Sequence, residues 1–475
     1  MKLELSPRDT GPSELGSSGI ISSEQNPASA IHGTMRLHIG YALFLGIILS
    51  VSALHPIVPT IIIAGCGAAI LIRPYRALQS LTLLAVVRYL NPTLVGFDSS
   101  FAILSGVVLA LAAVRYGPGV FRKLPPTSIA LICFAAIMLA VSPIVSSAPL
   151  ISELKLISFT IMALTILVIT QKMSAEDREA FLSWYYSLTA IVLTISVPFY
   201  FLPQIGFAVN GVGFQGILNH PQAFAIFLTP ITSCLAIKIG FSAKRNWYDF
   251  VFLAFLVASI TLSQARTAAL AVTCSVILVS AILMFQKNGR LAMTRKGQAA
   301  ILFLATTAVA LSVLLFVPKA QEIASSFIFK RETQTVDEAL ETRTGGIASH
   351  IKNFQKSPIL GNGFGVPADG QFRGEVVEIY GLPISAPVEK GFLPTAILEE
   401  TGILGAALFF YWLFLAFRFA CKGRSGVYEA LFAAAFFVNF GELSFFSMNS
   451  LGLLNFALIG AAITHGASGG LVRDS

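Results

Sequence analysis

The feature that most constrains this chain is a long series of apolar runs separated by short polar gaps. A helix needs about 20 apolar residues to cross the hydrocarbon core of a bilayer, within a range of about 17–25. Runs that approach or meet this length lie near 37–54, 57–72, 77–90, 100–115, 127–146, 153–171, 180–202, 220–239, 248–264, 266–285, 299–317, 393–417, 428–447 and 450–465. Only 12% of the residues are charged, about half the share found in soluble proteins. The predicted fold class is an all-α, polytopic membrane bundle of about 12–14 transmembrane helices, the run at 77–90 being short enough for a partial span.

Basic residues fall in every second gap between the apolar runs. They gather around 73–76, 115–123, 172–178, 244–245, 287–296 and 418–424, whereas the gaps 91–99, 147–152 and 203–219 hold almost none. Cytoplasmic loops are enriched in Lys and Arg. The alternation therefore predicts both termini in the cytoplasm and the large loop at 318–392 outside.

The chain divides into four predicted segments. Residues 1–36 are rich in Ser, Gly and Pro, lack the apolar stretch of a signal peptide, and are predicted to be a disordered cytoplasmic tail. Residues 37–317 form the N-terminal transmembrane bundle, 318–392 the large loop, and 393–475 the C-terminal helices with a short tail. Within the loop, Ile347, Ile351 and Phe354 recur at helical spacing, which predicts a short amphipathic helix on the membrane or against the bundle.

Three cations lie near the outer ends of predicted helices. Arg266 stands at the start of the run 266–285, where an unpaired charge is costly unless it lines a cavity or meets a partner. Either it snorkels to lipid head groups, or its guanidinium holds the oxygens of a phosphate. Arg88 and Lys155, each structural when taken alone, would form with Arg266 a cationic, substrate-binding pocket at the outer leaflet.

The loop holds further polar candidates. Arg343 and His350 lie seven residues apart, and either could simply be solvated. The glycine-rich segment 361–365 could bind an anion through its backbone, although such a pattern without a preceding strand is more often a turn.

Carboxylates gather where the loop meets the next apolar run. Glu389 and Lys390 precede this run, and Glu399 and Glu400 lie in its first turns. Acidic residues entering an apolar helix are costly unless they face a polar cavity, where a shielded carboxylate can act as a general base. One of these carboxylates could therefore be the base, and Glu442 in the outer half of the run 428–447 is a second candidate of the same kind.

Several classes of partner are not predicted. The basic residues are scattered rather than clustered, which argues against nucleic acid. The five cysteines lie in or beside apolar runs, and no outward gap carries a D-x-D or paired-acid motif. We therefore expect no disulfide framework, no metal site and no cofactor.

The chain resembles the O-antigen ligase and polysaccharide polymerase superfamily of bacterial inner membranes. The likeness rests on stretches between about 210 and 415: GFQGILNHPQAFAIFLTPI at 213–231, the S-x-x-R ending at Arg266, Arg343 followed by SPILGNGFG at 357–365, and ILEETGILGAALFF at 397–410. No single motif is specific, but their order and their membrane placement match. The resemblance implies about a dozen helices and a large periplasmic loop before the last few.

It also implies an activity, namely metal-independent transfer of a glycan, with inversion, from undecaprenyl diphosphate to an acceptor hydroxyl. Arg266 and Arg343 would then bind the diphosphate, with His350, Lys390 and Glu442 among the substrate-binding residues. Ligases of this family usually carry a His shortly before the L-x-E-x-G element, where this chain has Glu389. Glu389 is therefore the predicted base in place of that His. We therefore expect a polymerase of exopolysaccharide or O-antigen repeat units, with a lipid A-core ligase and a flippase or transporter as alternatives. The implied partners are the lipid-linked oligosaccharide, an acceptor glycan, the lipid bilayer and, as a further candidate, a chain-length regulator.

Overall fold

The computed structural model describes residues 57–94, 99–118, 125–209, 211–241, 246–285, 336–372, 376–379, 382–385, 390–446 and 451–471. The predicted tail at 1–36, the predicted helices at 37–54 and 299–317, and the first part of the loop at 318–335 lie outside these residues. Glu389 also lies outside them.

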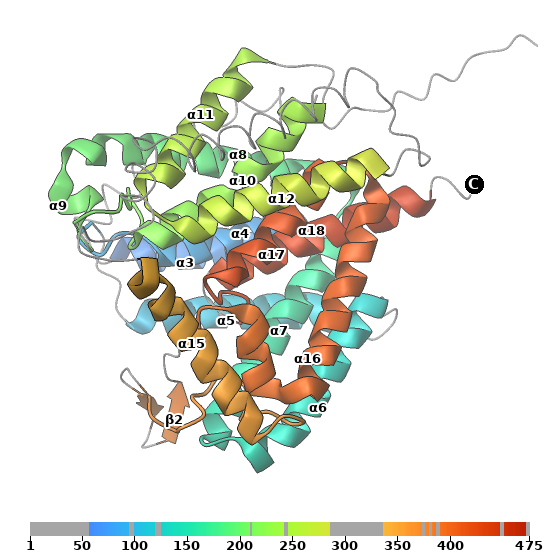
Figure 1. Cartoon of the computed structure of the whole chain (residues 1–475). Coiled ribbons are helices and arrows are strands. Elements are labelled where there is room, and N and C mark those ends of the chain that lie inside the picture. Colours follow the sequence, from blue (N-terminus) through green and yellow to red (C-terminus); the bar gives the residue numbers. More distant parts are fainter. Residues whose placement is uncertain are drawn as a thin grey trace, which may run out of the picture.

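Every predicted apolar run that falls on described residues forms a helix (Figure 1). The α-helices and the 3-10 helices (η) are α3 (Ile57–Ile70), α4 (Pro74–Arg88), α5 (Ser99–Tyr116), α6 (Pro126–Val145), α7 (Pro149–Gln171), α8 (Ala175–Ser196), η2 (Val197–Phe201), α9 (Pro203–Gly206), α10 (Pro221–Phe241), α11 (Trp247–Leu262), α12 (Arg266–Phe285), α15 (Val336–Lys356), α16 (Leu393–Ala420), η3 (Cys421–Gly423), α17 (Val427–Phe437), η4 (Val438–Phe440) and α18 (Leu451–Leu471).

Local sequence explains where several helices begin and end. Proline occupies one of the first two positions of α4, α6, α7 and α16, where its missing N–H costs nothing. α8 begins earlier than the apolar pattern predicts, because Ser174 and Asp177 form a reciprocal capping box. The predicted run 428–447 is wrong at its end, since the helical structure stops at Phe440 and a turn follows.

The described helices have the length and composition of a membrane protein. Six are long and apolar enough to cross a bilayer, namely those within 126–145, 149–171, 175–201, 221–241, 266–285 and 393–423. Shorter apolar helices lie at 61–70, 103–116, 247–262, 427–440 and 451–467. Apart from one small hairpin in the large loop, the described residues thus form a helical membrane bundle, and the full count of about 12–14 spans stays a prediction.

Loops that the charge pattern assigns to the outside contact one another. Asn91 donates from its backbone N–H to the Ile217 carbonyl at 2.8 Å and from its side chain to the Ile205 carbonyl at 2.9 Å. The Phe214 N–H donates to the Leu262 carbonyl at 2.9 Å. Segments after α4, α8 and α11 therefore meet at one end of the bundle.

Loops assigned to the cytoplasm also contact one another, at the other ends of their helices. The Tyr116 hydroxyl donates to the Ile70 carbonyl at 2.8 Å, and Lys172 donates to the Tyr116 carbonyl at 3.1 Å. The rings of Tyr428 and His465 stack with centroids 4.1 Å apart. In these contacts each loop meets loops of its own group, and which group faces the cytoplasm stays a prediction.

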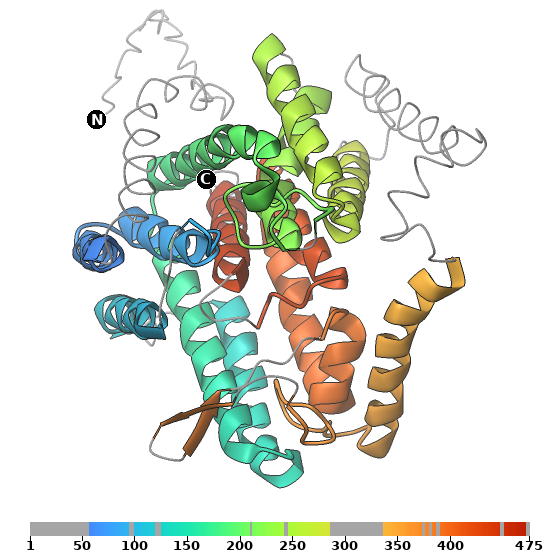
Figure 2. The ribbon, with the colours of Figure 1, turned by 90° about the vertical axis from the view of Figure 1, so that its left-hand side faces the viewer.

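One hydrophobic core joins the helices before and after the large loop. α16 packs on α6, α17 packs on α10 and α12, and α18 packs on α7. Figures 1 and 2 show the C-terminal helices lying among the earlier ones rather than beside them. The loop at 318–392 therefore separates the two sets of membrane helices in sequence but not in space, where they form a single packed unit.

The described part of the large loop contains one long helix and a small hairpin. The predicted amphipathic helix is present as α15, which packs against α16 (Figure 2). Strands β1 (Val377–Ile379) and β2 (Leu382–Ser385) pair antiparallel, and β2 lies against α7. The loop thus covers one end of α7 and α16.

Candidate functional site

The candidate site is built around a break in α16. Gly402 has φ 63° and ψ −170° inside this otherwise helical segment. This conformation favours glycine, and a β-carbon here would overlap the Ile359 carbonyl group. The break lies two residues after the adjacent pair Glu399 and Glu400, and it frees the backbone carbonyls of this pair from the helix.

The glycine-rich loop satisfies the groups that the break releases. The N–H groups of Asn362 and Gly363 donate to the carbonyls of Glu399 and Glu400 at 2.9 and 3.0 Å. In the reverse direction, the Ile403 N–H donates to the Pro358 carbonyl at 2.9 Å. The predicted role of 361–365 as an anion-binding nest does not fit these two N–H groups, because buried helix carbonyls already occupy them.

Side chains from two directions hold the rest of this loop. Four successive carbonyls, those of residues 364–367, each accept a hydrogen bond from a side chain, in order from Ser152 at 2.9 Å, Lys155 at 2.6 Å, Lys390 at 3.0 Å and Ser147 at 2.8 Å. The Phe364 ring is 1% exposed and packs on Phe159 and Phe446, with centroids 5.8 and 4.9 Å away. The loop is therefore a fixed wall of the site.

Lys390 lies between two buried carboxylates. Its Nζ is 3.5 Å from Glu399 Oε2 and 3.2 Å from Glu400 Oε1. Lys390 is 7% exposed and each glutamate is 2% exposed. Burying charge is costly unless the charges are paired, and here Lys155 adds a second cation that interacts with Glu400 and Lys390. Two cations thus balance two anions in one enclosed cluster.

α15 contributes a polar face to this charge cluster. His350 Nδ1 lies 2.9 Å from the Thr395 hydroxyl, and its Nε2 lies 3.6 Å from Glu399 Oε2. Asn353 donates to Glu399 Oε1 at 3.0 Å. Burial lowers the pKa of His350, and the nearby Lys390 ammonium lowers it further. A neutral imidazole beside a carboxylate can accept or relay a proton.

Two carboxylate oxygens in the cluster have spare hydrogen-bonding capacity. Glu399 Oε2 and Glu400 Oε2 are closed off from solvent and accept no hydrogen bond within the described residues. Buried polar groups are normally satisfied by protein or by ordered water. These oxygens are therefore places where a donor, such as a hydroxyl group, would be stabilised.

Arg266 and Arg88 lie beside segment 213–220. Arg266 is half-buried at the start of α12, one residue beyond Ala265 and two beyond Gln264, whose φ of 54° makes the turn tight. Arg88 is exposed at the end of α4, where the Tyr89 carbonyl accepts from the Asn219 N–H at 2.6 Å. These cations flank segment 213–220, whereas Lys155 lies with Lys390. These contacts do not test whether all three cations share one pocket, so that pocket stays a prediction.

Glu442 stands between the two regions. It is half-buried and follows Gly441, whose α-carbon packs against the Thr267 side chain on α12. A β-carbon on Gly391, the neighbour of Lys390, would lie 3.3 Å from the Gly441 carbonyl oxygen. The turn that carries Glu442 therefore contacts the immediate neighbours of both Arg266 and Lys390.

Two predicted residues can be placed only in part. The backbone of Arg343 lies in α15, seven residues and about 10 Å before His350 on the same helix. Its side chain is not among the described parts of the structure. Glu389 directly precedes Lys390 in sequence but is itself outside the described residues. The predicted roles of both residues stay predictions.

Sequence reasoning missed the residues that complete the cluster. Asn353 and Thr395 were not candidates, although Asn353 lies three residues after His350 and thus on the same helix face. Asn362 joins them, since its side chain donates to the carbonyls of Asn353 and Glu399 at 2.9 and 3.1 Å. Of these three residues, only Asn353 could be predicted from sequence, by its helical spacing from His350. The contacts of Thr395 and Asn362 depend on the tertiary fold.

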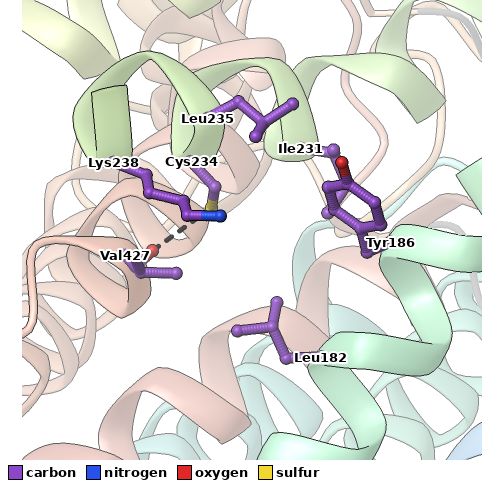
Figure 3. A pocket seen from close by; sticks show the side chains of 7 residues that line it. All are labelled: Leu182, Tyr186, Ile231, Cys234, Leu235, Lys238 and Val427. Atoms are coloured by element: carbon purple, nitrogen blue, oxygen red, sulfur yellow. Dashed lines mark hydrogen bonds between the residues drawn. The ribbon is translucent and has the colours of Figure 1, made fainter. Parts of the chain in front are cut away.

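A small pocket of about 20 Å³ lies elsewhere, between α8, α10 and α17 (Figure 3). Its lining residues are Leu182, Tyr186, Ile231, Cys234, Leu235, Lys238 and Val427. Lys238 is paired with Asp249 at 3.0 Å. The cavity contains none of the predicted site residues and is mainly apolar, so it does not serve as the candidate site.

In the part of the chain that the structure describes, no three side chains of His, Cys, Asp or Glu come together as metal ligands would. The cluster offers instead ammonium groups, carboxylates and an imidazole, which are suited to proton transfer and to binding hydroxyl groups. No protein-family model matches the chain, and no curated protein matches it.

Proposed function

We propose that the protein is a polymerase of lipid-linked polysaccharide repeat units in a bacterial inner membrane. It transfers a growing exopolysaccharide or O-antigen glycan from undecaprenyl diphosphate to the hydroxyl of an acceptor glycan at the periplasmic face. Both termini lie in the cytoplasm and the large loop in the periplasm. The proposal combines the family resemblance with the charged cluster around Lys390.

The observation that carries the proposal is the enclosed, charge-balanced cluster near one end of a membrane helix. From Ile403 to Ala420 the part of α16 after the break contains 18 residues and is about 27 Å long, close to the thickness of the hydrocarbon core. Glu399 and Glu400 therefore lie towards one membrane surface. A lipid-linked diphosphate presents its glycan at that depth.

The proposed reaction is a direct displacement. The acceptor O–H gives its proton to a carboxylate while its oxygen bonds to the anomeric carbon, and the bond from that carbon to the diphosphate oxygen breaks with inversion. The leaving diphosphate gains negative charge, and Arg266 and Arg343 stabilise it because fixed cations favour the charge that develops. Glu389 is the proposed base. The described glutamates Glu399 and Glu400 are the alternatives for this role.

A ligase is the second candidate, and one contact favours it. In space, His350 lies 3.6 Å from Glu399, so an imidazole lies beside the L-E-E-T-G element although no His comes shortly before this element in sequence. In a ligase this His would take part in activating the acceptor hydroxyl of lipid A-core. The predicted ranking of substitutions separates the two: a polymerase loses more activity from Glu389→Gln than from His350→Ala, and the reverse ranking moves the base role to His350.

A flippase or transporter is the third candidate, because transporters use broken membrane helices with charged groups at the break. In transporters these groups lie near the bilayer midplane, whereas the length of α16 after Gly402 supports a position near one surface. Lipid flipping by the purified protein in vesicles, with polymer assembly intact in its absence, would establish this alternative.

The experiment that tests the proposal compares glycans from a deletion strain carrying wild type, Arg266→Ala or Arg343→Ala. We expect both variants to accumulate in the membrane and to form no long polymer, with single repeat units on the core or a loss of exopolysaccharide. Polymer of normal length from either variant contradicts the arginine clamp. A bare core with long polymer left on undecaprenyl diphosphate identifies a ligase.

A further inference from the structure

The turn after α17 is held from within by one buried side chain. The side-chain oxygen of Asn439 accepts from the Ser444 N–H at 2.8 Å, the Ser444 hydroxyl at 3.1 Å and the Phe445 N–H at 2.8 Å. Its amide donates to the Ala435 carbonyl at 2.8 Å, and Asn455 donates to the Ser444 hydroxyl at 2.8 Å. Because Asn439 is 0% exposed, this network fixes the turn at 441–445 in one conformation.

The same turn fits tightly against α12. A β-carbon added to Gly441 would overlap the γ-atoms of Thr267 and lie 2.8 Å from its β-carbon. Gly391, two residues before α16, approaches the same glycine, since a β-carbon there would lie 3.3 Å from the Gly441 carbonyl oxygen. The turn is therefore a spacer of fixed thickness between α12 and the start of α16.

The chain neighbours of these contact residues are the charged groups of the candidate site. Arg266 adjoins Thr267, and Lys390 adjoins Gly391. We propose that Asn439 and Gly441 are positioning residues that set the separation between Arg266 and the Lys390–Glu399–Glu400 cluster. This inference rests on the proposed function, in which the first group binds the diphosphate and the second faces the acceptor. A displacement of about 1 Å between reacting groups can lower a rate about 100-fold.

The decisive variant is Gly441→Ala, measured as polymer formation by membranes supplied with lipid-linked repeat units. We expect kcat to fall about 10–100-fold while KM for the lipid-linked substrate changes little, because Arg266 itself is intact. Adding Thr267→Ala removes the γ-atoms that the new methyl group meets. The double variant should regain most of the lost rate, and Thr267→Ala alone should lose little.

A matched control separates positioning from a general loss of packing. Gly460 on α18 faces Thr170 on α7 in the same way, since a β-carbon there would lie 2.7 Å from the Thr170 hydroxyl, but this contact is far along α7 from Lys155. Gly460→Ala should therefore lower thermal stability in detergent with little change in kcat. Asn439→Ala should behave like Gly441→Ala.

The outcomes are distinct. A wild-type rate for Gly441→Ala, a loss that Thr267→Ala does not relieve, or an equal loss of kcat in Gly460→Ala would each overturn the positioning role. Arg266→Ala is measured alongside. If it forms normal polymer, the clamp of the proposed function fails, whatever Gly441→Ala does. If only Arg266→Ala is inactive, the proposed function stands and the spacer role is wrong.

Discussion

Replacing Lys390 with methionine tests the charge cluster most directly. Methionine keeps much of the length of the side chain but removes the ammonium that lies 3.5 Å from Glu399 and 3.2 Å from Glu400. Both glutamates are 2% exposed, so bulk water cannot take the place of the cation. Removing one partner of a buried ion pair costs about 3–5 kcal/mol.

The size of this cost should depend on pH, because the protein can take up a proton instead of burying an unpaired charge. A model glutamate in water is half protonated near pH 4.3, so adding a proton costs about 3.7 kcal/mol at pH 7 and about 1 kcal/mol at pH 5. The lost hydrogen bond to Val366 adds about 1 kcal/mol at either pH. The destabilisation relative to wild type should therefore be about 2.7 kcal/mol smaller at pH 5 than at pH 7.

The assay is thermal unfolding of the purified protein in detergent at pH 7 and pH 5. Wild type is compared with Lys390→Met, with Lys390→Arg, which keeps the charge, and with Lys390→Met combined with Glu400→Gln. We expect a Tm deficit for Lys390→Met that is large at pH 7 and small at pH 5, and a partial recovery in the double variant at pH 7. An equal deficit at both pH values would refute the reasoning, because it would mean that no unpaired carboxylate is left behind.

Three further predictions concern stability. Gly402→Ala should cost about 3 kcal/mol or more, since it combines a positive φ with overlap of a carbonyl group; its control Gly345→Ala, in α15 with open space around it, should not lower the Tm. Wild type should lose stability as the pH falls below about 6.5. Burial lowers the pKa of His350 in the folded protein, so the unfolded chain binds the proton more readily. His350→Gln should reduce this loss, and an unchanged dependence of stability on acid pH would show that His350 does not cause it. Asp249→Asn should leave Lys238 buried without its partner and lower the Tm as a loss of about 3 kcal/mol would, with normal polymer per molecule of protein; a loss of polymer would mean that this pair supports the site.

The apolar runs alone predict the apolar helices among the described residues, and the reason is physical. The free energy of placing a residue in a bilayer is nearly local and additive, so a window of about 20 residues carries the signal. The run 428–447 failed at its end because a single carboxamide, that of Asn439, satisfies the backbone of a turn. A hydropathy average cannot predict such a hydrogen bond.

The candidate site was predictable only as a set of residue types. The sequence identified Lys390, Glu399 and Glu400 as charges entering an apolar helix, because such charges must face something polar. The tertiary structure decided the rest. Lys155 interacts with Glu400 and Lys390, and His350 lies beside Glu399 although 49 positions separate them in sequence. In the glycine-rich loop, the N–H groups of Asn362 and Gly363 donate to carbonyls released by the break in α16 and are therefore not free for an anion. These contacts depend on how separate helices pack, and packing is a property of the whole core rather than of any window of the chain.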